Sequence, residues 1–273
     1  LNQDGIIINS DFKRYGARLN LDVSEGIFKF GITLNPSLTI ENKVNSDGAY
    51  NSNGGGVVAS ALHSSPIFPV YNDDGSFCFV QNSWSADTET IMDDGSIKRG
   101  NSQTQVWNPV ALAMLQKDEK KASRIFGNIY GEVAFLPSLK YRANFGVDLY
   151  NDSEDTFRPS TIPLSNTKGN PESIPEATSQ TSRIYNWVFE QTLSYNKNFG
   201  GHSVSVLGGW TMQYQRDESN YAFANGFIIN SIPTLNAGTV TRGNSNASEW
   251  SLLSALARIQ YNYLGKYMIT GAL

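Results

Sequence analysis

The sequence predicts an all-β protein, an antiparallel transmembrane β-barrel segment of about eight strands with short turns on one rim and long loops on the other. Three observations support this fold class. Long runs alternate between apolar and polar residues, the connections between them fall into two lengths, and glycine and aromatic residues are plentiful in the 273-residue chain. Successive side chains of a strand point to opposite faces, so each run has one apolar and one polar face.

The clearest alternation extends from Phe28 to Glu41. Its even positions are apolar from Phe28 to Ile40, and its odd positions are glycine or polar from Lys29 onward. Soluble strands are usually about 5–6 residues long, whereas a tilted barrel strand needs about 9–11 residues to cross a bilayer. This run is therefore long enough to span a membrane. Pro36 lies within it and lacks a backbone N–H, so we expect a bulge or an edge-like position there.

Similar alternation elsewhere in the chain predicts the remaining strands. Their polar faces carry charges and amides, as expected of a water-filled lumen rather than a packed core. The expected strands are residues 11–23, 27–42, 119–135, 139–156, 182–198, 202–217, 249–263 and 267–273.

The connections between these strands alternate between short and long. The short ones contain glycine or proline, which supply the backbone angles of a tight reversal; they are residues 24–26, 136–138, 199–201 and 264–266. Antiparallel neighbours place alternate connections at opposite ends of a sheet, so the long connections share the other rim. Outer-membrane barrels have this asymmetry, with short periplasmic turns and long extracellular loops. The expected long loops are residues 43–118, 157–181 and 218–248.

The longest loop contains signals for local structure. Residues 57–63 and 109–116 are each expected to form a short helix, and Asn108 is a suitable N-cap followed by proline at the first helical position. Residues 72–76 and 93–96 each contain Asp-Asp-Gly-Ser. They lack the alternating oxygen ligands and closing glutamate of an EF-hand, so we interpret them as turns.

Composition excludes several classes of function. The net charge is −4 without a basic patch, so nucleic acid is not an expected partner. The mean hydropathy is −0.34, and no apolar run reaches the length of about 18 residues that a membrane-spanning helix needs. Cys78 is the only cysteine, so no internal disulfide or thiolate metal site is expected. No carboxylate has a companion nucleophile at a useful spacing. We therefore predict no catalytic residue, cofactor or metal site, and no enzyme.

Several stretches, taken in their order and spacing, resemble one family. They are NQDGIIINSDFKRYGARLNLDV (2–23), PVYNDDGS (69–76), NPVALAMLQKDEKKASRIFGNIYGEVAFLPSLKYRANFGVDLYN (108–151), FRPS (157–160), LSYNKNFGGHSVSVLGGW (193–210) and WSLLSALARIQYNYLGKYMITGAL (250–273). The chain resembles the SusC/RagA-type TonB-dependent outer-membrane transporters nearly from end to end.

The resemblance implies a larger barrel of about 22 strands, closed by an N-terminal plug. It implies location in the outer membrane of a Gram-negative bacterium, in contact with outer-membrane lipid. The implied partners are a SusD-like surface lipoprotein acting as a lid and the TonB–ExbB–ExbD complex, which drives import from the proton gradient. The implied substrates are glycans or oligopeptides too large for passive porins.

We expect residues 1–273 to form one partial β-barrel domain from the interior of a longer protein. The chain starts at Leu1 without a methionine or signal peptide, and an alternating run beginning at Tyr267 stops at Leu273. On this expectation the plug, the TonB-binding segment and the remaining strands lie outside the chain.

Aromatic residues of the longest loop are candidate ligand or partner contacts. Tyrosine and tryptophan faces stack on sugars or pack against a partner protein. The alternative is that they only hold the loop together. The loop aromatics are Tyr71, Phe77, Phe79, Trp84 and Trp107, of which Tyr71, Trp84 and Trp107 are the candidates.

The polar and apolar faces carry further candidates. Inward-facing charges are expected to line the lumen and to hold the plug by polar contacts; the expected plug contacts are Arg18, Arg124, Arg142 and Arg258. Outward-facing aromatics near strand ends are expected to form the interfacial girdles of a barrel; they are Tyr15, Phe28, Tyr195, Tyr214, Trp250 and Tyr263.

Two alternatives come from other classes of protein. One is a soluble carbohydrate-binding β-sandwich, in which the polar faces would meet solvent and the loops would hold the ligand. The other is a passive porin or adhesin barrel, which would have no plug and no TonB-binding segment.

Overall fold

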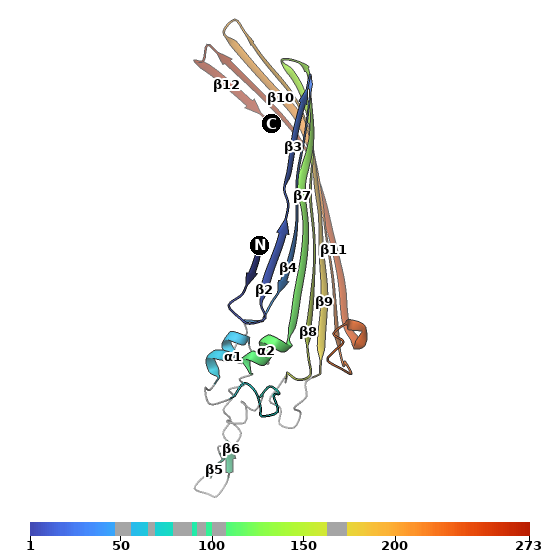
Figure 1. Ribbon diagram of the computed structural model, residues 1–273. Coiled ribbons are helices and arrows are strands. Elements are labelled where there is room, and N and C mark those ends of the chain that lie inside the picture. The colour runs from blue at the N-terminus through green and yellow to red at the C-terminus, as the bar shows by residue number, and fades with distance from the viewer. Residues whose placement is uncertain (47–55, 65–68, 79–88, 92–96, 100–107, 163–173) are drawn as a thin grey trace.

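The computed structural model describes the chain except for residues 47–55, 65–68, 79–88, 92–96, 100–107 and 163–173. Its main feature is one tall, curved sheet (Figure 1). Ten strands form this sheet in the order β1-β2-β4-β7-β8-β9-β10-β11-β12, with β3 also pairing with β4. Each of these pairs is antiparallel, which confirms the predicted fold class.

The strands of the sheet follow one another in chain order. They are β1 (Asn2–Asp4), β2 (Asp11–Gly16), β3 (Leu19–Glu25), β4 (Phe28–Asn42), β7 (Lys117–Leu136), β8 (Leu139–Arg158), β9 (Glu176–Phe199), β10 (His202–Asn225), β11 (Thr239–Tyr263) and β12 (Tyr267–Ala272). A separate hairpin joins β5 (Glu89–Ile91) to β6 (Ile97–Arg99).

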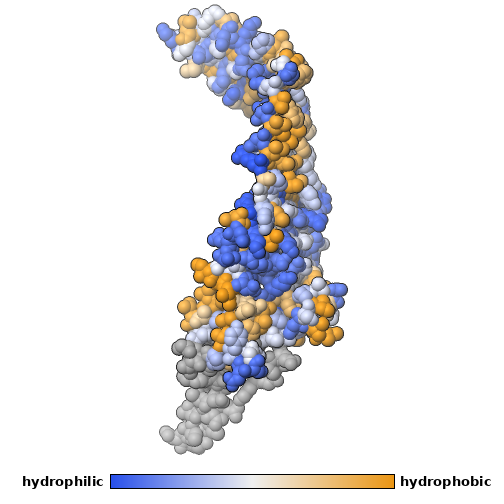
Figure 2. Space-filling model, in the orientation of Figure 1, coloured by the Kyte–Doolittle hydropathy of each residue, from blue (hydrophilic) through white to orange (hydrophobic). Residues whose placement is uncertain are grey.

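The cross-strand register aligns apolar side chains into continuous rows. Ile129 on β7 pairs with Ile32 on one side and with Phe145 on the other. Phe145 in turn pairs with Phe189 on β9, which pairs with Met212 on β10. Residues opposite one another in a ladder point to the same face of the sheet. The rows therefore form one apolar face, which Figure 2 shows in part as hydrophobic residues along the upper half of the wall.

The opposite face carries polar rows at the same height. Asn128 donates a hydrogen bond to the Asn144 side chain at 3.0 Å, and Asn144 donates to Glu190 at 3.0 Å. Each of these residues is a chain neighbour of a member of the apolar row. The wall is thus two-sided, with the polar and apolar faces that the alternation predicts.

The tightest hairpins, those after β3, β7, β9 and β11, all lie at one end of the sheet, whereas the short link between β1 and β2, residues 5–10, lies at the other end. Gly26, between β3 and β4, has φ of +57°, and Gly265, between β11 and β12, has φ of +70°. This left-handed region is open to glycine and costly for most other residues. The hairpins lie at the upper end in Figure 1, while the helices and long connections lie at the lower end. The predicted sorting of short and long connections is confirmed.

The strands extend further on the loop side than predicted. The loop expected at 218–248 is mostly strand, because β10 ends at Asn225 and β11 begins at Thr239. In the other loop, expected at 157–181, β8 continues to Arg158 and β9 already begins at Glu176. The alternation that defined the predicted boundaries ends where the lipid-facing positions become polar. The backbone ladder continues past that point, so hydropathy alone placed these boundaries too early.

The strand predicted at 11–23 is divided into β2 and β3, and Pro36 explains the division. Gly16 pairs with Ser37 before the interruption and Leu19 pairs with Leu34 after it, so the register is continuous. Between them the Ala17 N–H donates to the Pro36 carbonyl at 3.1 Å. Proline has no N–H to return the bond. Of the two expected outcomes, the bulge is wrong, because the register does not shift, and the edge-like position is present, because Pro36 is paired in the ladder with β7 but not on the β2–β3 side.

The two predicted helices are present at the loop end. They are α1 (Val57–His63) and α2 (Pro109–Leu115). The Asn108 side chain caps α2 by accepting hydrogen bonds from the N–H groups of Val110 and Ala111 at 3.1 Å each. A buried apolar cluster joins the two helices to the connection between β8 and β9; it consists of Val57, Leu112, Ala113 and Ile162.

A second buried cluster lies where β8, β9 and β10 end. It consists of Phe157, Ala177, Ala224 and Phe227, with the 3-10 helix η2 (Leu235–Ala237) packed nearby. Both clusters lie at the loop end of the molecule. Among the described residues, the buried apolar core caps the wall and is not sandwiched between two sheets.

Pro36→Val should strengthen the ladder between β2–β3 and β4. The new N–H faces the Ala17 carbonyl and completes the reciprocal pair, which we expect to add about 1 kcal/mol. Amide hydrogen exchange in the full-length protein should then slow by about fivefold around Ala17. Pro137→Val in the β7–β8 turn, where no ladder bond can be gained, is the control. Unchanged exchange around Ala17 would contradict the explanation.

Phe145→Arg should destabilise the membrane-inserted protein by about 2–4 kcal/mol, because it places a charge in the apolar face. Asn144→Arg, one residue away on the polar face, should cost much less. Equilibrium folding of the full-length protein into liposomes measures both variants. Equal losses would show that the two faces are assigned wrongly.

Candidate functional site: the inner face of the wall

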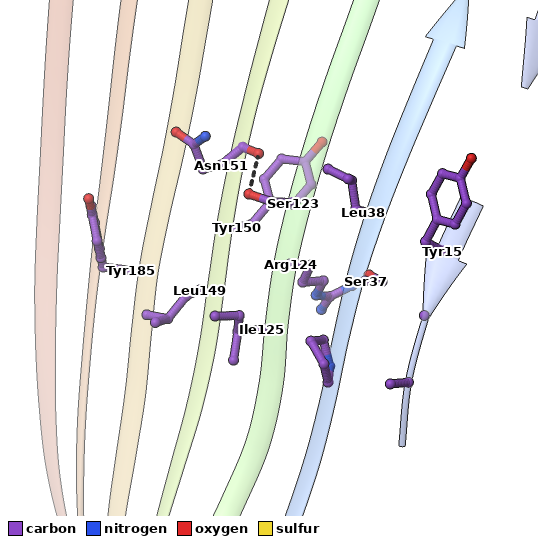
Figure 3. Close-up of a pocket in the computed structure, with 13 residues that line it drawn as sticks. Tyr15, Ser37, Leu38, Ser123, Arg124, Ile125, Leu149, Tyr150, Asn151 and Tyr185 are labelled. Atoms are coloured by element: carbon purple, nitrogen blue, oxygen red, sulfur yellow. Dashed lines mark hydrogen bonds between the residues drawn. The ribbon is translucent and has the colours of Figure 1, made fainter. Parts of the chain in front are cut away.

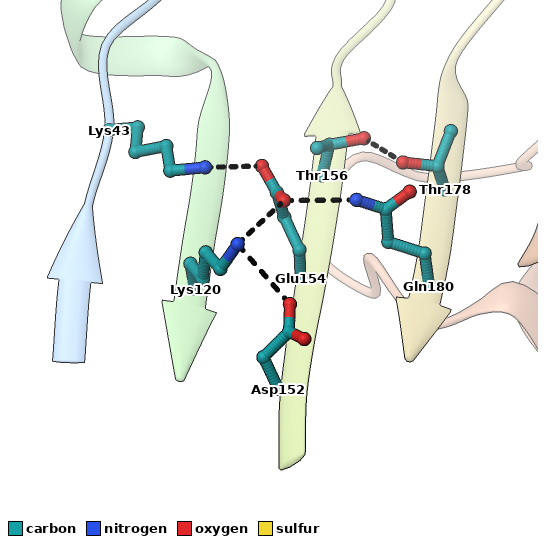
Figure 4. Close-up of polar contacts among 7 residues, drawn as sticks. All are labelled: Lys43, Lys120, Asp152, Glu154, Thr156, Thr178 and Gln180. Carbon is teal, nitrogen blue, oxygen red and sulfur yellow. Dashed lines mark hydrogen bonds and ion pairs between the residues drawn. The ribbon is translucent and has the colours of Figure 1, made fainter. Parts of the chain in front are cut away.

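A charged network occupies the polar face on the loop side of the apolar rows (Figure 4). Glu154 on β8 is at its centre and accepts a hydrogen bond from the Lys43 ammonium at 2.7 Å and from the Gln180 amide at 3.0 Å. Lys120 on β7 lies 3.2 Å from the Asp152 carboxylate and 4.0 Å from Glu154. These side chains meet because they occupy alternate, same-face positions of neighbouring strands.

Asp118 adds an unusual carboxyl group beside this network. One of its oxygens, Oδ1, is buried and has no hydrogen-bond partner. Burial, followed by the negative charge of Glu154, raises the pKa of Asp118 to about 6, although Lys43 opposes the shift. A hydrogen bond to Glu154 also favours the protonated form of Asp118.

Glu154 shifts in the opposite direction. Burial alone raises the pKa of Glu154, but hydrogen bonds from Lys43 and Gln180 and the charges of Lys43 and Lys120 bring it below its usual value. Glu154 therefore stays ionised in mildly acidic solution, whereas Asp118 takes up a proton.

A second feature of the polar face is a hollow of about 570 Å³ where β2 gives way to β3. Three arginines line it: Arg14, Arg18 and Arg124. Arg124 is neutralised by a bidentate pair with Asp148, at 2.7 and 2.6 Å. Arg14 and Arg18 have no carboxylate partner within the part of the chain that the structure describes. We call this feature the arginine hollow.

The arginine hollow brings together two of the four predicted plug-contact residues, Arg18 and Arg124. Arg14 was missed, although its place in the alternation puts it on the same face as Arg18. Arg142 lies elsewhere, nearer the hairpin turns, with its guanidinium 4.0 Å from the centre of the Tyr130 ring. Arg258 lies on β11, opposite Leu207 of β10, and does not join the hollow.

The loop aromatics are only partly described. Tyr71 forms an isolated bridge with Phe77, and their ring centres are 5.0 Å apart. Asn108 holds this turn against α2 by donating to the Val70 and Cys78 carbonyls at 2.8 and 3.1 Å. Tyr71 remains exposed. The other predicted loop aromatics, Phe79, Trp84 and Trp107, and the predicted turn at 93–96 lie outside the described residues.

One aromatic is on the opposite face from the one predicted. Trp250 on β11 pairs with Gln215 on β10. Tyr214, the chain neighbour of Gln215, pairs with Trp187 on the apolar face. Trp250 therefore lies on the polar face with Gln215 and does not belong to the lipid-facing girdle. Its neighbour Leu252 is also on the polar face, so local hydropathy gave a misleading assignment there.

The described residues contain no group of three or more His, Cys, Asp or Glu side chains arranged to hold a metal ion. They also contain no helix that is both long and apolar enough to cross a membrane.

Comparisons with known proteins agree with this architecture. No family model matches the chain. TonB-dependent receptor P3 of Formosa agariphila is 31% identical over 273 residues, covering 98% of this chain and 25% of that protein. TonB-dependent receptor P26 of the same organism is 28% identical, again covering 98% of this chain and 25% of that protein. The chain thus spans about a quarter of the length of these relatives.

Solved structures share the fold. A structure of the RagAB peptide transporter matches 96% of this chain and 27% of that chain, with 18% identity and a TM-score of 0.70. The closed-closed state of the RagAB peptide importer matches 99% of this chain and 28% of that chain, with 18% identity and a TM-score of 0.72. The two-sided antiparallel wall is a segment of a transmembrane β-barrel. Over nearly its whole length the chain is similar to proteins named TonB-dependent receptors, and it shares the fold of part of the RagAB transporter.

Asp118→Asn should stabilise the loop end of β7 at neutral pH. The raised pKa of Asp118 means that the folded protein binds this proton more tightly than the unfolded chain does, so the carboxyl group destabilises the fold increasingly as the pH rises through about 6. Asparagine removes this penalty. Amide exchange at the start of β7 should be slower in the variant at pH 7.5, and the difference should shrink at pH 4.

Ser153→Ala, a non-titrating change on the other face of β8, is the control for Asp118→Asn. An effect of Asp118→Asn that is the same at both pH values would contradict the assigned pKa shift.

Proposed function

We propose that this chain forms part of the barrel wall of a TonB-dependent importer in the outer membrane of a Gram-negative bacterium. The observation that carries the proposal is the two-sided wall: apolar rows on one face, and charges and amides on the other. Similarity over nearly the whole chain to proteins named TonB-dependent receptors supports it. The substrates we propose are glycans or oligopeptides too large for passive diffusion.

The polar face is proposed to contact a plug domain of the complete protein. The arginine hollow supplies Arg14 and Arg18, two cationic side chains without a carboxylate partner among the described residues. Carboxylates on a plug surface would neutralise them with charge-assisted hydrogen bonds. Arg142 and Arg258 are proposed as further contacts, with Arg142 already oriented by Tyr130.

The loop end is proposed to meet a SusD-like surface lipoprotein. Apolar side chains are exposed there, including Leu62 of α1, which is 78% exposed, and Met114 of α2, which is 52% exposed. Tyr71 lies on the same side of the molecule, and Trp84 and Trp107 are proposed as additional ligand or partner contacts. Import would be driven by TonB–ExbB–ExbD acting on the complete protein.

The soluble β-sandwich alternative lacks a structural basis in the described residues. A sandwich buries the apolar faces of two sheets against each other. Here exposed apolar residues continue along one face of the wall; examples are Ile129, Phe145, Leu193 and Leu253. The passive porin alternative differs from the proposal in its energy source, and experiment separates the two.

Uptake measured in the presence and absence of an uncoupler tests the proposal. Cells carrying the full-length protein should accumulate fluorescently labelled oligopeptides or oligosaccharides, and collapse of the proton gradient should abolish this uptake. Cells lacking the protein provide the background. Uptake that persists after uncoupling would support a passive barrel and overturn the importer assignment.

Combining Arg14→Gln with Arg18→Gln should loosen the plug while sparing barrel insertion. Both changes remove positive charge from the arginine hollow, so passive entry of small solutes should rise. Lys13→Gln, at the adjacent position on the other face of β2, is the matched control and should leave permeability unchanged. Equal permeability of the double variant and the wild type would contradict a role for the hollow in holding the plug.

A further inference from the structure

A groove of about 520 Å³ lies on the apolar face, on the other side of the wall from the arginine hollow (Figure 3). Tyr15 borders it on β2, and Leu149 and Tyr185 border it on β8 and β9. Its base has little side-chain bulk, because Ala17 lies opposite Pro36 at the opened ladder and the neighbouring Gly16, which pairs with Ser37, has no side chain. The same proline that interrupts the hydrogen-bonding pattern is therefore part of the depression in the outer surface.

The groove lies at the loop-side boundary of the apolar face. Ile125 pairs with Leu149, and Leu149 pairs with Tyr185, so three apolar side chains form one row. Two residues further toward the loops, the next row begins with Tyr15 and Leu38 and becomes polar at Ser123 and Asn151, all of which line the groove. The groove thus has an apolar end within the lipid-facing band and a polar end at its margin.

A cation lies at the polar end. The Arg183 guanidinium donates a hydrogen bond to the Asn151 side chain at 3.2 Å. Its ladder partner on β10, Glu218, is instead paired with Arg216 at 2.7 Å. Arg183 is exposed and has no carboxylate partner in the part of the chain that the structure describes. Its charge is therefore available to an anion that approaches from the membrane side.

We propose that this groove is a binding site for one membrane lipid with a phosphorylated headgroup. An acyl chain occupies the apolar end between Pro36 and Tyr185, and the phosphate pairs with Arg183. Continuity of the groove with the lipid-facing rows favours an acyl chain as its occupant. The position of Arg183 favours an anionic headgroup over a neutral one. The proposal rests on the membrane location given under the proposed function.

Native mass spectrometry of the purified full-length protein tests the site with two matched probes. Dioleoyl phosphatidic acid and dioleoylglycerol have the same acyl chains and differ in the phosphate. We expect Ala17→Phe, which fills the base of the groove, to retain one phosphatidic acid fewer than the wild type. We expect Arg183→Gln to weaken phosphatidic acid binding by about tenfold and to leave dioleoylglycerol binding unchanged.

The controls place the same changes elsewhere on the apolar face. Ala143→Phe adds the same ring away from the groove, and Lys197→Gln removes a cation near the hairpin turns. Equal lipid retention by Ala17→Phe and Ala143→Phe, or equal phosphatidic acid binding by Arg183→Gln and Lys197→Gln, would overturn the site. If Ala17→Phe fails to fold, phosphatidic acid binding by Arg183→Gln is by itself the test of the site. Because the Arg183 side chain is exposed, replacing it leaves the packing of the sheet intact.

Uncoupler-sensitive uptake, measured on the same variants, separates this proposal from the proposed function. Loss of lipid retention with uptake preserved supports the site. Uptake that is absent from the wild type, with lipid retention changing as expected, would reject the importer assignment and leave the lipid site standing.

Discussion

The structure depends on one constraint: inside a bilayer, each backbone N–H and C=O group of a strand needs a partner on a neighbouring strand. Long antiparallel ladders meet this requirement, and they also fix which side chains share a face. A register shift of one residue would move Phe145 from the lipid side to the lumen. The apolar rows, the amide row through Asn144 and the charged network around Glu154 all follow from one continuous register.

Pro36 shows how the sheet accommodates a residue that breaks this rule. The ladder forgoes one hydrogen bond, keeps its register and leaves a depression on each face of the wall. Because the two faces differ in chemistry, the same backbone opening lines a cationic hollow on one side and an apolar groove on the other. A local defect in hydrogen bonding thus coincides with the two most distinctive surfaces of the segment.

Much of this fold could be predicted from the sequence, for physical reasons. The lipid side requires apolar residues at every second position, so alternation located the membrane-spanning part of each strand. Asn108 followed by proline located the start of α2. Beyond the band, water accepts polar residues on both faces. The continuation of β10 from Asp217 to Asn220 is therefore polar on both faces and shows no alternation, and Trp250 shows that a large aromatic can also face the lumen.

The candidate site was harder to predict, because it depends on which strands are neighbours. Alternation placed Arg18 and Arg124 on the inner face, but only the pairing of β4 with both β2 and β7 brings them to one hollow. The same pairing separates Arg142 and Arg258 from them. The raised pKa of Asp118 was equally hidden, since it arises from burial beside Glu154, a residue of the next strand.

The strand extensions on the loop side have a mechanical consequence. Beyond the apolar part of the sheet, β10 remains hydrogen-bonded to β9 and β11 up to Asn225. The edge-to-face contact of Phe157 with Phe227 packs against the ends of these strands. A hydrogen-bonded sheet resists bending far better than a chain of turns. The loop end of these strands is therefore a stiff rim, because the ladder hydrogen bonds hold β9, β10 and β11 in register there.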